Sequence, residues 1–310
     1  MHKISNDYPE TLAAEWVLSN VCNYECSYCT PVLNDGSSGW PDVNVAKEFW
    51  NFVHTDINPN DKMLTLTGGE PTLWPNLTEF FNGLHPSWYT AIVTNGSRTI
   101  RWWKKFLKEC SNIHRVTISL HLEFADIDHI LEVCKLLEHR VQLTVLIMFK
   151  NIKYGRKVAN KFKESNINAS VTIKPIVDRS TIASVKYEEK DKKFMKKFRM
   201  HQRQGPHLRI PVAAHLYIDG KWQHVEYAHQ MIFNKTNDFR GWRCEIGSKR
   251  LLVWHDGTVY GAQCGTAKNN PLGNIKDKKI KKITSIVCDT PHCNCVPDLR
   301  IPKWKEDVSV

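Results

Sequence analysis

The segment Cys22-Asn-Tyr-Glu-Cys26-Ser-Tyr-Cys29 places three cysteines in one short loop, directly after a predicted strand. Three thiolates at this CxxxCxxC spacing can hold three irons of a four-iron four-sulfur cluster, which leaves one iron open for another ligand. A closed structural zinc site takes four protein ligands and would need a distant fourth residue. Either way, the loop is predicted to bind a metal.

A second motif, Leu66-Thr67-Gly68-Gly69-Glu70-Pro71, follows the next predicted strand. Glycines at a strand end let the backbone approach a ligand closely, and a neighbouring carboxylate can accept hydrogen bonds from an ammonium group. A zinc site accounts for the thiols but not for this motif. The two motifs in this order therefore form a specific combination that a zinc site alone does not explain.

Around these motifs, β-rich runs alternate with helical patterns. The predicted strands are Glu15–Leu18, Met63–Thr67, Thr90–Thr94, Arg115–Leu120, Val141–Phe149 and Ser170–Val177, and the predicted helices are Val43–His54, Leu77–Leu84, Arg101–Glu109, Ile127–Leu137, Lys157–Glu164 and Glu188–Met200. This alternation implies βα crossovers and a parallel sheet. Six units suit an open, partial (β/α)6 TIM barrel of the α/β class, whose working face lies at the carboxyl ends of the strands.

The βα rhythm stops near Gln204-Gly205-Pro206. Beyond it, Asp219-Gly220 and Asp256-Gly257 each separate two short alternating runs, which is typical of a β-hairpin. The hairpin strands are predicted at His215–Ile218 with Lys221–Val225, and at Arg250–Trp254 with Thr258–Tyr260. We therefore expect a barrel domain over residues 1–204 and a small β-rich, cysteine-rich domain over residues 205–310.

The composition is that of an ordinary globular protein. Hydrophobic residues make up 42% and charged residues 24% of the 310-residue chain, which excludes wholesale disorder and fibrous repeats. No apolar run approaches the roughly 18 residues of a membrane span, and Met1–Asp7 precedes no apolar signal core. We expect a cytoplasmic protein without a membrane partner, whose ten cysteines are metal ligands or free thiols rather than disulfides.

The net charge of +11 favours anionic partners but does not identify one. The segment Arg98–Lys105 interleaves basic residues with two tryptophans, and aromatic rings beside cations bind single-stranded nucleic acids. The alternative, which we favour, is an amphipathic helix that buries Trp102, Phe106 and Leu107. A nucleic-acid partner is thus possible but not preferred.

The two motifs and the βα layout over roughly residues 14–200 resemble the radical S-adenosylmethionine (SAM) superfamily. The resemblance implies a 4Fe-4S cluster held by Cys22, Cys26 and Cys29, with the amino and carboxylate groups of SAM on the open iron. One electron, from a donor such as flavodoxin or ferredoxin, would cleave SAM to methionine and a 5'-deoxyadenosyl radical that abstracts a hydrogen atom from the substrate. The protein would supply orientation and exclusion of water.

The same resemblance assigns SAM-binding roles to residues at several strand ends. Glu70, with the backbone of the two glycines, would hold the SAM ammonium, and Tyr28 would pack near the adenine. Ser119 and His121 resemble contacts to the ribose or carboxylate, although both also suit ordinary polar capping of a strand end. The expected SAM-binding residues are Tyr28, Gly68, Gly69, Glu70, Pro71, Thr94, Asn95, Ser119 and His121.

The C-terminal segment resembles the cysteine-rich extensions of radical SAM enzymes known as SPASM and twitch domains. Matching features are a cysteine followed by a glycine, a hairpin with Asp-Gly, a second cysteine and the segment Leu272-Gly-Asn-Ile275. Seven cysteines for two auxiliary clusters define the full SPASM pattern, so the one-cluster twitch version fits better. The expected ligands of this second 4Fe-4S cluster are four of Cys244, Cys264, Cys288, Cys293 and Cys295.

Which of the five cysteines is spare stays open at this point. The family pattern supports Cys244 and Cys264, and an extended backbone would place Cys293 and Cys295 on one face. Cys288 has the weakest support. A helix around Lys279–Ile286 is expected to return the last three cysteines to the first two, and a four-cysteine structural zinc site is the alternative.

The leading interpretation is a radical SAM enzyme, of unknown subclass, that acts on a small polar molecule or a peptide side chain with help from the auxiliary cluster. A nucleotide- or RNA-modifying radical SAM enzyme is the first alternative. A non-catalytic cysteine-rich metal-binding protein is the second, although it leaves the Gly68–Pro71 motif without a purpose.

Overall fold

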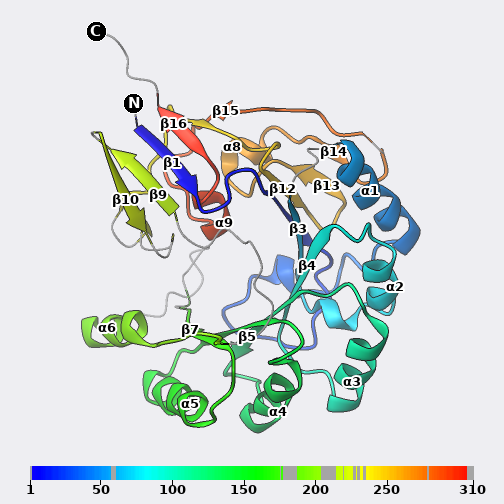
Figure 1. Cartoon of the computed structure of the whole chain (residues 1–310), viewed down its shortest axis with the longest axis vertical. Helices are drawn as coiled ribbons and strands as arrows, with labels where there is room; N and C mark the ends of the chain where they lie inside the picture. The colour runs from blue at the N-terminus through cyan, green and yellow to red at the C-terminus, as the bar shows by residue number, and fades with distance from the viewer. Residues whose placement is uncertain are drawn as a thin grey trace.

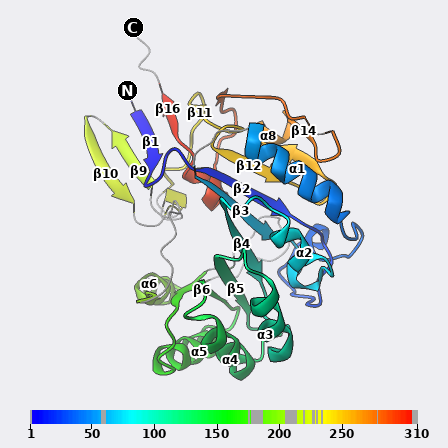
Figure 2. The ribbon, with the colours of Figure 1, turned by 45° about the vertical axis from the view of Figure 1, so that its right-hand side comes forward.

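The computed structural model describes residues 2–56, 61–174, 176, 187–203, 214–218, 220–225, 228, 231–232, 235–277 and 279–305. In these ranges two sheets are present, and Figure 1 shows the helices α1 to α6 in an arc along the outside of the larger one. Figure 2, turned by 45°, shows the smaller sheet at one end of the larger sheet, beside strands β12 to β14. The α/β fold with an open parallel sheet is therefore confirmed.

The larger sheet has the strand order β14-β13-β12-β2-β3-β4-β5-β6-β7-β8. Strands β2 to β7 are parallel to their neighbours, as is β12 to β2, whereas β13, β14 and β8 are antiparallel edge strands. Their bounds are β2 Leu12–Val17, β3 Lys62–Thr67, β4 Trp88–Thr94, β5 Arg115–His121, β6 Gln142–Met148, β7 Ser170–Ile173, β8 Arg199–Met200, β12 Arg250–Val253, β13 Thr258–Tyr260 and β14 Gly273–Asn274.

Each predicted helix of the barrel is present. The bounds are α1 Val43–Asp56, α2 Leu77–Asn82, α3 Ile100–Glu109, α4 Ile127–Leu137, α5 Ile152–Glu164 and α6 Glu189–Lys197, with short 3-10 helices at Pro31–Leu33 and Pro71–Leu73. Apolar faces of these helices pack on the sheet. For example, Trp50 of α1 is fully buried between Trp16 of β2 and Trp88 of β4, with ring centroids 6.0 and 5.8 Å away.

Helix α3 decides between the two interpretations of the aromatic-basic segment. Trp103 and Phe106 are fully buried, and Trp102 is half-buried and stacked on Phe106 at 5.0 Å. These three rings thus pack in or against the hydrophobic core, as expected of an amphipathic helix, although the most deeply buried tryptophan is Trp103 rather than Trp102. The aromatic rings are not displayed as a platform for stacking bases.

The smaller sheet combines both ends of the chain. Its order is β10-β9-β1-β16-β11-β15, with bounds β1 His2–Asn6, β9 Ala214–Ile218, β10 Lys221–Val225, β11 Arg243–Cys244, β15 Ile286–Val287 and β16 Lys303–Lys305. The N-terminal strand β1 pairs with β9 and β16, while β12 to β14 extend the barrel sheet. The two expected domains therefore exchange strands, and the boundary near residue 204 remains a prediction.

The helix expected around Lys279–Ile286 is wrong. This stretch is extended: Ile280 forms a bridge with Gly273, Lys281 N–H donates to Leu272 O at 2.7 Å, and β15 begins at Ile286. Its isoleucines recur every third residue, which is closer to the helical period than to the two-residue period of a strand, but backbone pairing with Gly273 and Leu272 holds the stretch extended. Two further short helices, α8 Gly265–Lys268 and α9 Val296–Leu299, lie elsewhere in the C-terminal part. Throughout the described ranges, every helix is too short or too polar to span a bilayer.

Candidate functional site

The loops that follow β2 and β3 lock together at the carboxyl edge of the sheet. Gly69 N–H donates to Ser19 O, and Glu70 N–H donates to Val21 O, both at 2.8 Å. A Cβ on Gly68 would lie 2.4 Å from Ser19 O, and one on Gly69 would lie 2.2 Å from Val21 O. The two glycines are thus required so that this loop can pack against the backbone that leads into Cys22.

Glu70 is the centre of a buried hydrogen-bond network. Its Oε1 accepts from Thr72 N–H at 3.0 Å and from the Thr94 hydroxyl at 2.7 Å, and its Oε2 accepts from Asn95 N–H at 2.6 Å. Burial raises the pKa of this carboxyl, and the donors around it act in the opposite direction. The side chain therefore joins the ends of β3 and β4, and Pro71 begins the following 3-10 helix.

The three-cysteine loop, residues 22–29, is fastened to the same edge. Asn95 Nδ2 donates to Asn23 Oδ1 at 2.9 Å, and Cys29 N–H donates to Cys26 O at 2.9 Å. Cys26 is buried, whereas Cys22 and Cys29 are half-buried. Burial raises the pKa of all three thiols, that of Cys26 to about 12. A nearby cation such as iron is therefore needed to make these groups thiolates.

Tyr28 and His121 are in direct contact. The Tyr28 hydroxyl lies 2.8 Å from His121 Nδ1, and the two rings are stacked with centroids 5.8 Å apart. Burial, followed by the charge of Lys174, lowers the pKa of His121 to about 4, so the imidazole is neutral at physiological pH. Ser119 is half-buried one residue before Leu120 on β5.

Two charged residues that the sequence motifs did not indicate contact the three-cysteine loop. Glu123 Oε2 accepts from Ser27 N–H at 2.8 Å, and Lys150 Nζ lies 3.1 Å from Glu123 Oε1. Lys150 Nζ also contacts the Ser27 hydroxyl and lies 5.6 Å from the centroid of the Tyr28 ring. The available signal was position: Glu123 and Lys150 each come two residues after the end of a parallel strand, β5 and β6.

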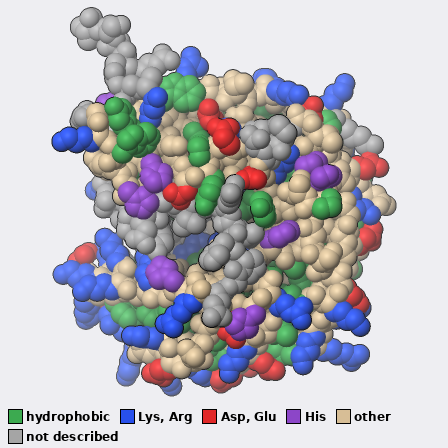
Figure 3. Space-filling model, in the orientation of Figure 1, with side chains coloured by type: hydrophobic (Ala, Val, Ile, Leu, Met, Phe, Trp, Pro, Cys, Tyr) green, Lys and Arg blue, Asp and Glu red, His purple; other side chains and the backbone are tan. Residues whose placement is uncertain are grey.

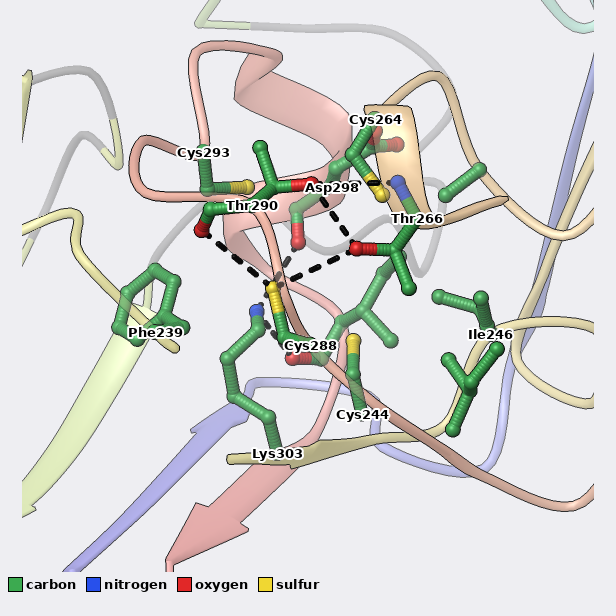
Figure 4. Close-up of a pocket in the computed structure, with 13 residues that line it drawn as sticks. Phe239, Cys244, Ile246, Cys264, Thr266, Cys288, Thr290, Cys293, Asp298 and Lys303 are labelled. Carbon is green, nitrogen blue, oxygen red and sulfur yellow. Dashed lines mark hydrogen bonds between the residues drawn. The ribbon is translucent and has the colours of Figure 1, made fainter. Parts of the chain in front are cut away.

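Four of the five C-terminal cysteines line one cavity, which we call the C-terminal cavity. Figure 4 shows Cys244, Cys264, Cys288 and Cys293 with their sulfurs turned toward a common space. Cys244 comes from β11, Cys264 caps α8, and Cys288 follows β15. The cavity is also lined by Phe239, Ile246, Ala262, Thr266, Ile286, Thr290, Asp298, Ile301 and Lys303.

Cys295 does not line this cavity. It is the residue before α9, and its Sγ lies 3.4 Å from Gln263 Oε1. Cys295 has an extended backbone, and its thiol is near enough to Cys293 for the charges of the two groups to interact, although only Cys293 lines the cavity.

The C-terminal cavity has one buried cation in its wall. Lys303 is 3% exposed, and its Nζ donates to the backbone oxygens of Asp298, Leu299 and Ile301 at 2.8 to 3.0 Å. Burial raises the pKa of Cys244 to about 12, and the charge of Lys303 acts in the opposite direction. A cluster with several thiolate ligands is anionic, so this cation would partly neutralise it.

In the ranges that the structure describes, no three histidine, cysteine or acidic side chains stand as a ready-made set of ligands for a single metal ion.

His255 is a further residue of interest that the sequence did not single out. It lies just beyond β12, whose Val253 pairs with Trp16 of the parallel strand β2, so it reaches the edge from which the three-cysteine loop departs. Both of its ring nitrogens are buried, and neither has a hydrogen-bond partner among the described residues. Buried polar atoms without partners are rare in native proteins and call for a local explanation.

His255→Phe is expected to raise the melting temperature. An apolar ring of similar shape removes the desolvation cost of two unpaired nitrogens, on the order of 1 to 2 kcal/mol, which is about 1.5 to 3 °C for a chain of this size. Differential scanning calorimetry measures the shift. His121→Phe is the matched control and should lower the melting temperature, because it leaves the Tyr28 hydroxyl without its partner. A fall for His255→Phe would mean that His255 already has a stabilising partner.

Comparisons with known proteins agree with this geometry. A family model of the radical SAM superfamily matches residues 16–167. The GTP 3',8-cyclase of Nautilia profundicola is 35% identical over 104 residues, which are 32% of this chain and 31% of that protein. The 7-carboxy-7-deazaguanine synthase of Methanothermobacter thermautotrophicus is 37% identical over 78 residues, 24% of this chain and 30% of that protein. These matches span less than a third of either relative.

Two groups of solved structures share the fold over most of the chain. The structure of native anSMEcpe with bound AdoMet has a TM-score of 0.54 and 19% identity, and the match covers 88% of this chain and 80% of that one. Streptococcus suis SuiB bound to the precursor peptide SuiA has a TM-score of 0.59 and 11% identity, and the match covers 87% of this chain and 64% of that one. Residues 16–167, just under half of the chain, match the radical SAM superfamily.

Proposed function

We propose that this protein is an enzyme that cleaves SAM reductively and abstracts a hydrogen atom from a small polar molecule or a peptide side chain. The observation that carries the proposal is the convergence of the three-cysteine loop and the Gly68–Pro71 motif at one strand edge, inside the matched domain. When bound, a 4Fe-4S cluster and SAM supply the radical chemistry.

In this proposal the chain's own residues bind and orient. Cys22, Cys26 and Cys29 hold the cluster, and the backbone around Gly68 and Gly69 receives the methionine part of SAM. The two oxygens of Glu70 already accept hydrogen bonds from neighbouring residues. Glu70 would therefore support binding of the SAM ammonium chiefly by holding Thr94 and Asn95 in position.

The other proposed SAM contacts lie on the opposite side of the loop. The pair Tyr28 and His121 would contact the adenosine part, with Ser119 on the same strand as His121. A neutral His121 can donate from one nitrogen and accept at the other, which suits a ribose hydroxyl. Glu123 and Lys150 would act as positioning residues, because they hold Ser27 between two of the cysteines.

The second part of the proposal is an auxiliary 4Fe-4S cluster in the C-terminal cavity, held by Cys244, Cys264, Cys288 and Cys293. Four thiols that face one space support it. Each cysteine ligand of a four-iron cluster binds a different iron, so the sulfurs stand farther apart than around one zinc ion. Metal analysis of the purified protein distinguishes this cluster from a zinc ion held by the same four thiols.

A second candidate function is nucleotide modification. The curated relatives named above are a GTP 3',8-cyclase and a 7-carboxy-7-deazaguanine synthase, and their names point to purine nucleotides or related bases. The matches cover 32% and 24% of this chain, so they support this candidate less than the fold-wide likeness supports the first one. Release of bound nucleotide on acid denaturation of the purified protein would favour this candidate.

The experiment that tests the proposal is anaerobic purification followed by metal analysis and single-turnover assay. We expect a brown protein with about eight irons per chain and 5'-deoxyadenosine on addition of SAM and dithionite. A protein with zinc alone, or with iron but no SAM cleavage, would remove the proposed activity. About four irons with SAM cleavage would retain the enzyme and remove the auxiliary cluster.

Glu70→Gln is expected to weaken SAM binding and lower the melting temperature together. Thr72, Thr94 and Asn95 all donate hydrogen bonds to the carboxylate. The NH₂ group of the new amide would face at least one of these donors, so that hydrogen bond would be lost. Loss of one charge-assisted hydrogen bond costs roughly 1.5 to 3 kcal/mol. When the ends of β3 and β4 pass this whole loss on to the SAM site, the dissociation constant of SAM rises about tenfold to 150-fold. Isothermal titration with SAM measures it, with Glu79→Gln on the exposed face of α2 as the control.

A further inference from the structure

Two histidines face each other across the hairpin formed by β9 and β10. His215 and His224 are directly opposite in the antiparallel register, and their Nδ1 atoms are 3.4 Å apart. His224 is exposed and His215 is half-buried. Neither residue lines the C-terminal cavity, and neither lies in the matched radical SAM domain. Figure 3 shows histidine side chains side by side on the face where β9 and β10 lie in Figure 1.

Asp7, which follows β1, fixes which ring nitrogen of a neutral His215 carries the hydrogen. Asp7 Oδ1 lies 2.7 Å from His215 Nε2. A carboxylate only accepts hydrogen bonds, so the proton of a neutral His215 is on Nε2. Its Nδ1 therefore carries a lone pair, and this lone pair faces His224.

The separation of the two Nδ1 atoms suits two ligands of one metal ion better than a hydrogen bond. Protein N–H hydrogen bonds have donor–acceptor distances of about 2.7 to 3.2 Å, shorter than the 3.4 Å found here. Two nitrogens that each lie about 2.0 to 2.1 Å from a tetrahedral metal ion are about 3.3 to 3.4 Å apart. A carboxylate on the far nitrogen of a histidine is also the usual arrangement behind a metal-binding imidazole.

We propose that His215 and His224 form a binding site for a late first-row divalent metal ion, such as Zn²⁺ or Ni²⁺, with Asp7 as the positioning residue. Imidazole nitrogens are preferred ligands of these ions. The two histidines supply two ligands, and water or another molecule takes the remaining positions. The site is independent of the proposed SAM chemistry and uses none of the cysteines.

The test is titration of the anaerobic, cluster-loaded protein with Ni²⁺ alone, followed by calorimetry. We expect one saturable site that His224→Ala weakens at least tenfold, and that Asp7→Asn weakens about 10-fold to 100-fold. His224 is exposed, so its variant should fold normally, which the melting temperature checks. His139→Ala removes an exposed histidine elsewhere and should leave the isotherm unchanged.

Identical Ni²⁺ isotherms for His224→Ala and the parent protein would overturn the proposal, as would the absence of any saturable binding. If the heat of Ni²⁺ binding disappears in Cys26→Ala but not in His224→Ala, the metal is bound by thiols, and the proposal is also overturned. Because the readout is Ni²⁺ binding, failure here leaves SAM cleavage and iron content unaffected.

Discussion

Cys26→Ala is expected to abolish SAM cleavage, with no 5'-deoxyadenosine formed above background. Two remaining thiolates cannot hold a four-iron cluster with one unique open iron. Cys26 is also the most deeply buried of the three cysteines, and its backbone oxygen accepts from Cys29 N–H. No neighbouring side chain can replace it: the Tyr28 hydroxyl is bonded to His121, and Glu123 is bonded to Ser27.

The measurement is iron content and 5'-deoxyadenosine yield after anaerobic reconstitution. Iron should fall by up to about four atoms per chain, with the C-terminal cluster retained. Cys134→Ala is the matched control, because Cys134 is fully buried in α4 away from both cysteine groups and should leave both values unchanged. Persistent 5'-deoxyadenosine formation in Cys26→Ala would contradict the assignment of the three-cysteine loop.

The barrel was predictable because its signals are local. Helix α4 has the predicted bounds, and its periodic apolar residues Ile127, Ile130, Val133 and Leu137 are all buried, together with Cys134. The pairing of β9 with β10 was predictable for the same reason, since both strands lie within a dozen residues. The exchange of β1 and β12 between the two parts was not predictable, because each pairs with strands more than 200 residues away.

The purpose of the site residues was harder to predict than their position. Sequence motifs indicated Gly68, Gly69 and Glu70, but the structure relates the glycines to the backbone at Ser19 and Val21, and the carboxylate to strand β4. Those contacts are between segments about 25 to 50 residues apart, and spacing alone does not specify them. The ion pair of Glu123 and Lys150, which contacts Ser27, was not predicted for the same reason.

The spare C-terminal cysteine could not be identified from alternation along the chain. Cys295 is extended and its thiol interacts with that of Cys293, as alternation suggests, yet it contacts Gln263 outside the cavity wall. Helix α9 begins directly after it, with Pro297 in the first turn, where the missing N–H of proline is not needed. Cys288, which had the weakest support in the sequence, lines the cavity instead.

This geometry leads to the second large effect, a contrast between Cys264→Ala and Cys295→Ala. If Cys244, Cys264, Cys288 and Cys293 hold the auxiliary cluster, Cys264→Ala should lower iron by up to about four atoms per chain. Cys295→Ala should keep the iron of the parent protein, because its sulfur faces Gln263. Both variants should still cleave SAM, since the strand edge with the three-cysteine loop is unaltered.

The two variants should also differ in thermal stability. A metal group that binds only the folded state adds its binding free energy to folding, so Cys264→Ala loses that contribution and Cys295→Ala does not. The three measurements are iron content, 5'-deoxyadenosine yield and melting temperature. Full iron in Cys264→Ala, or loss of iron in Cys295→Ala, would contradict the proposed ligand set. Zinc bound in the parent protein at the C-terminal cysteines would instead make the cavity a structural site, because zinc supplies stability without a path for electrons.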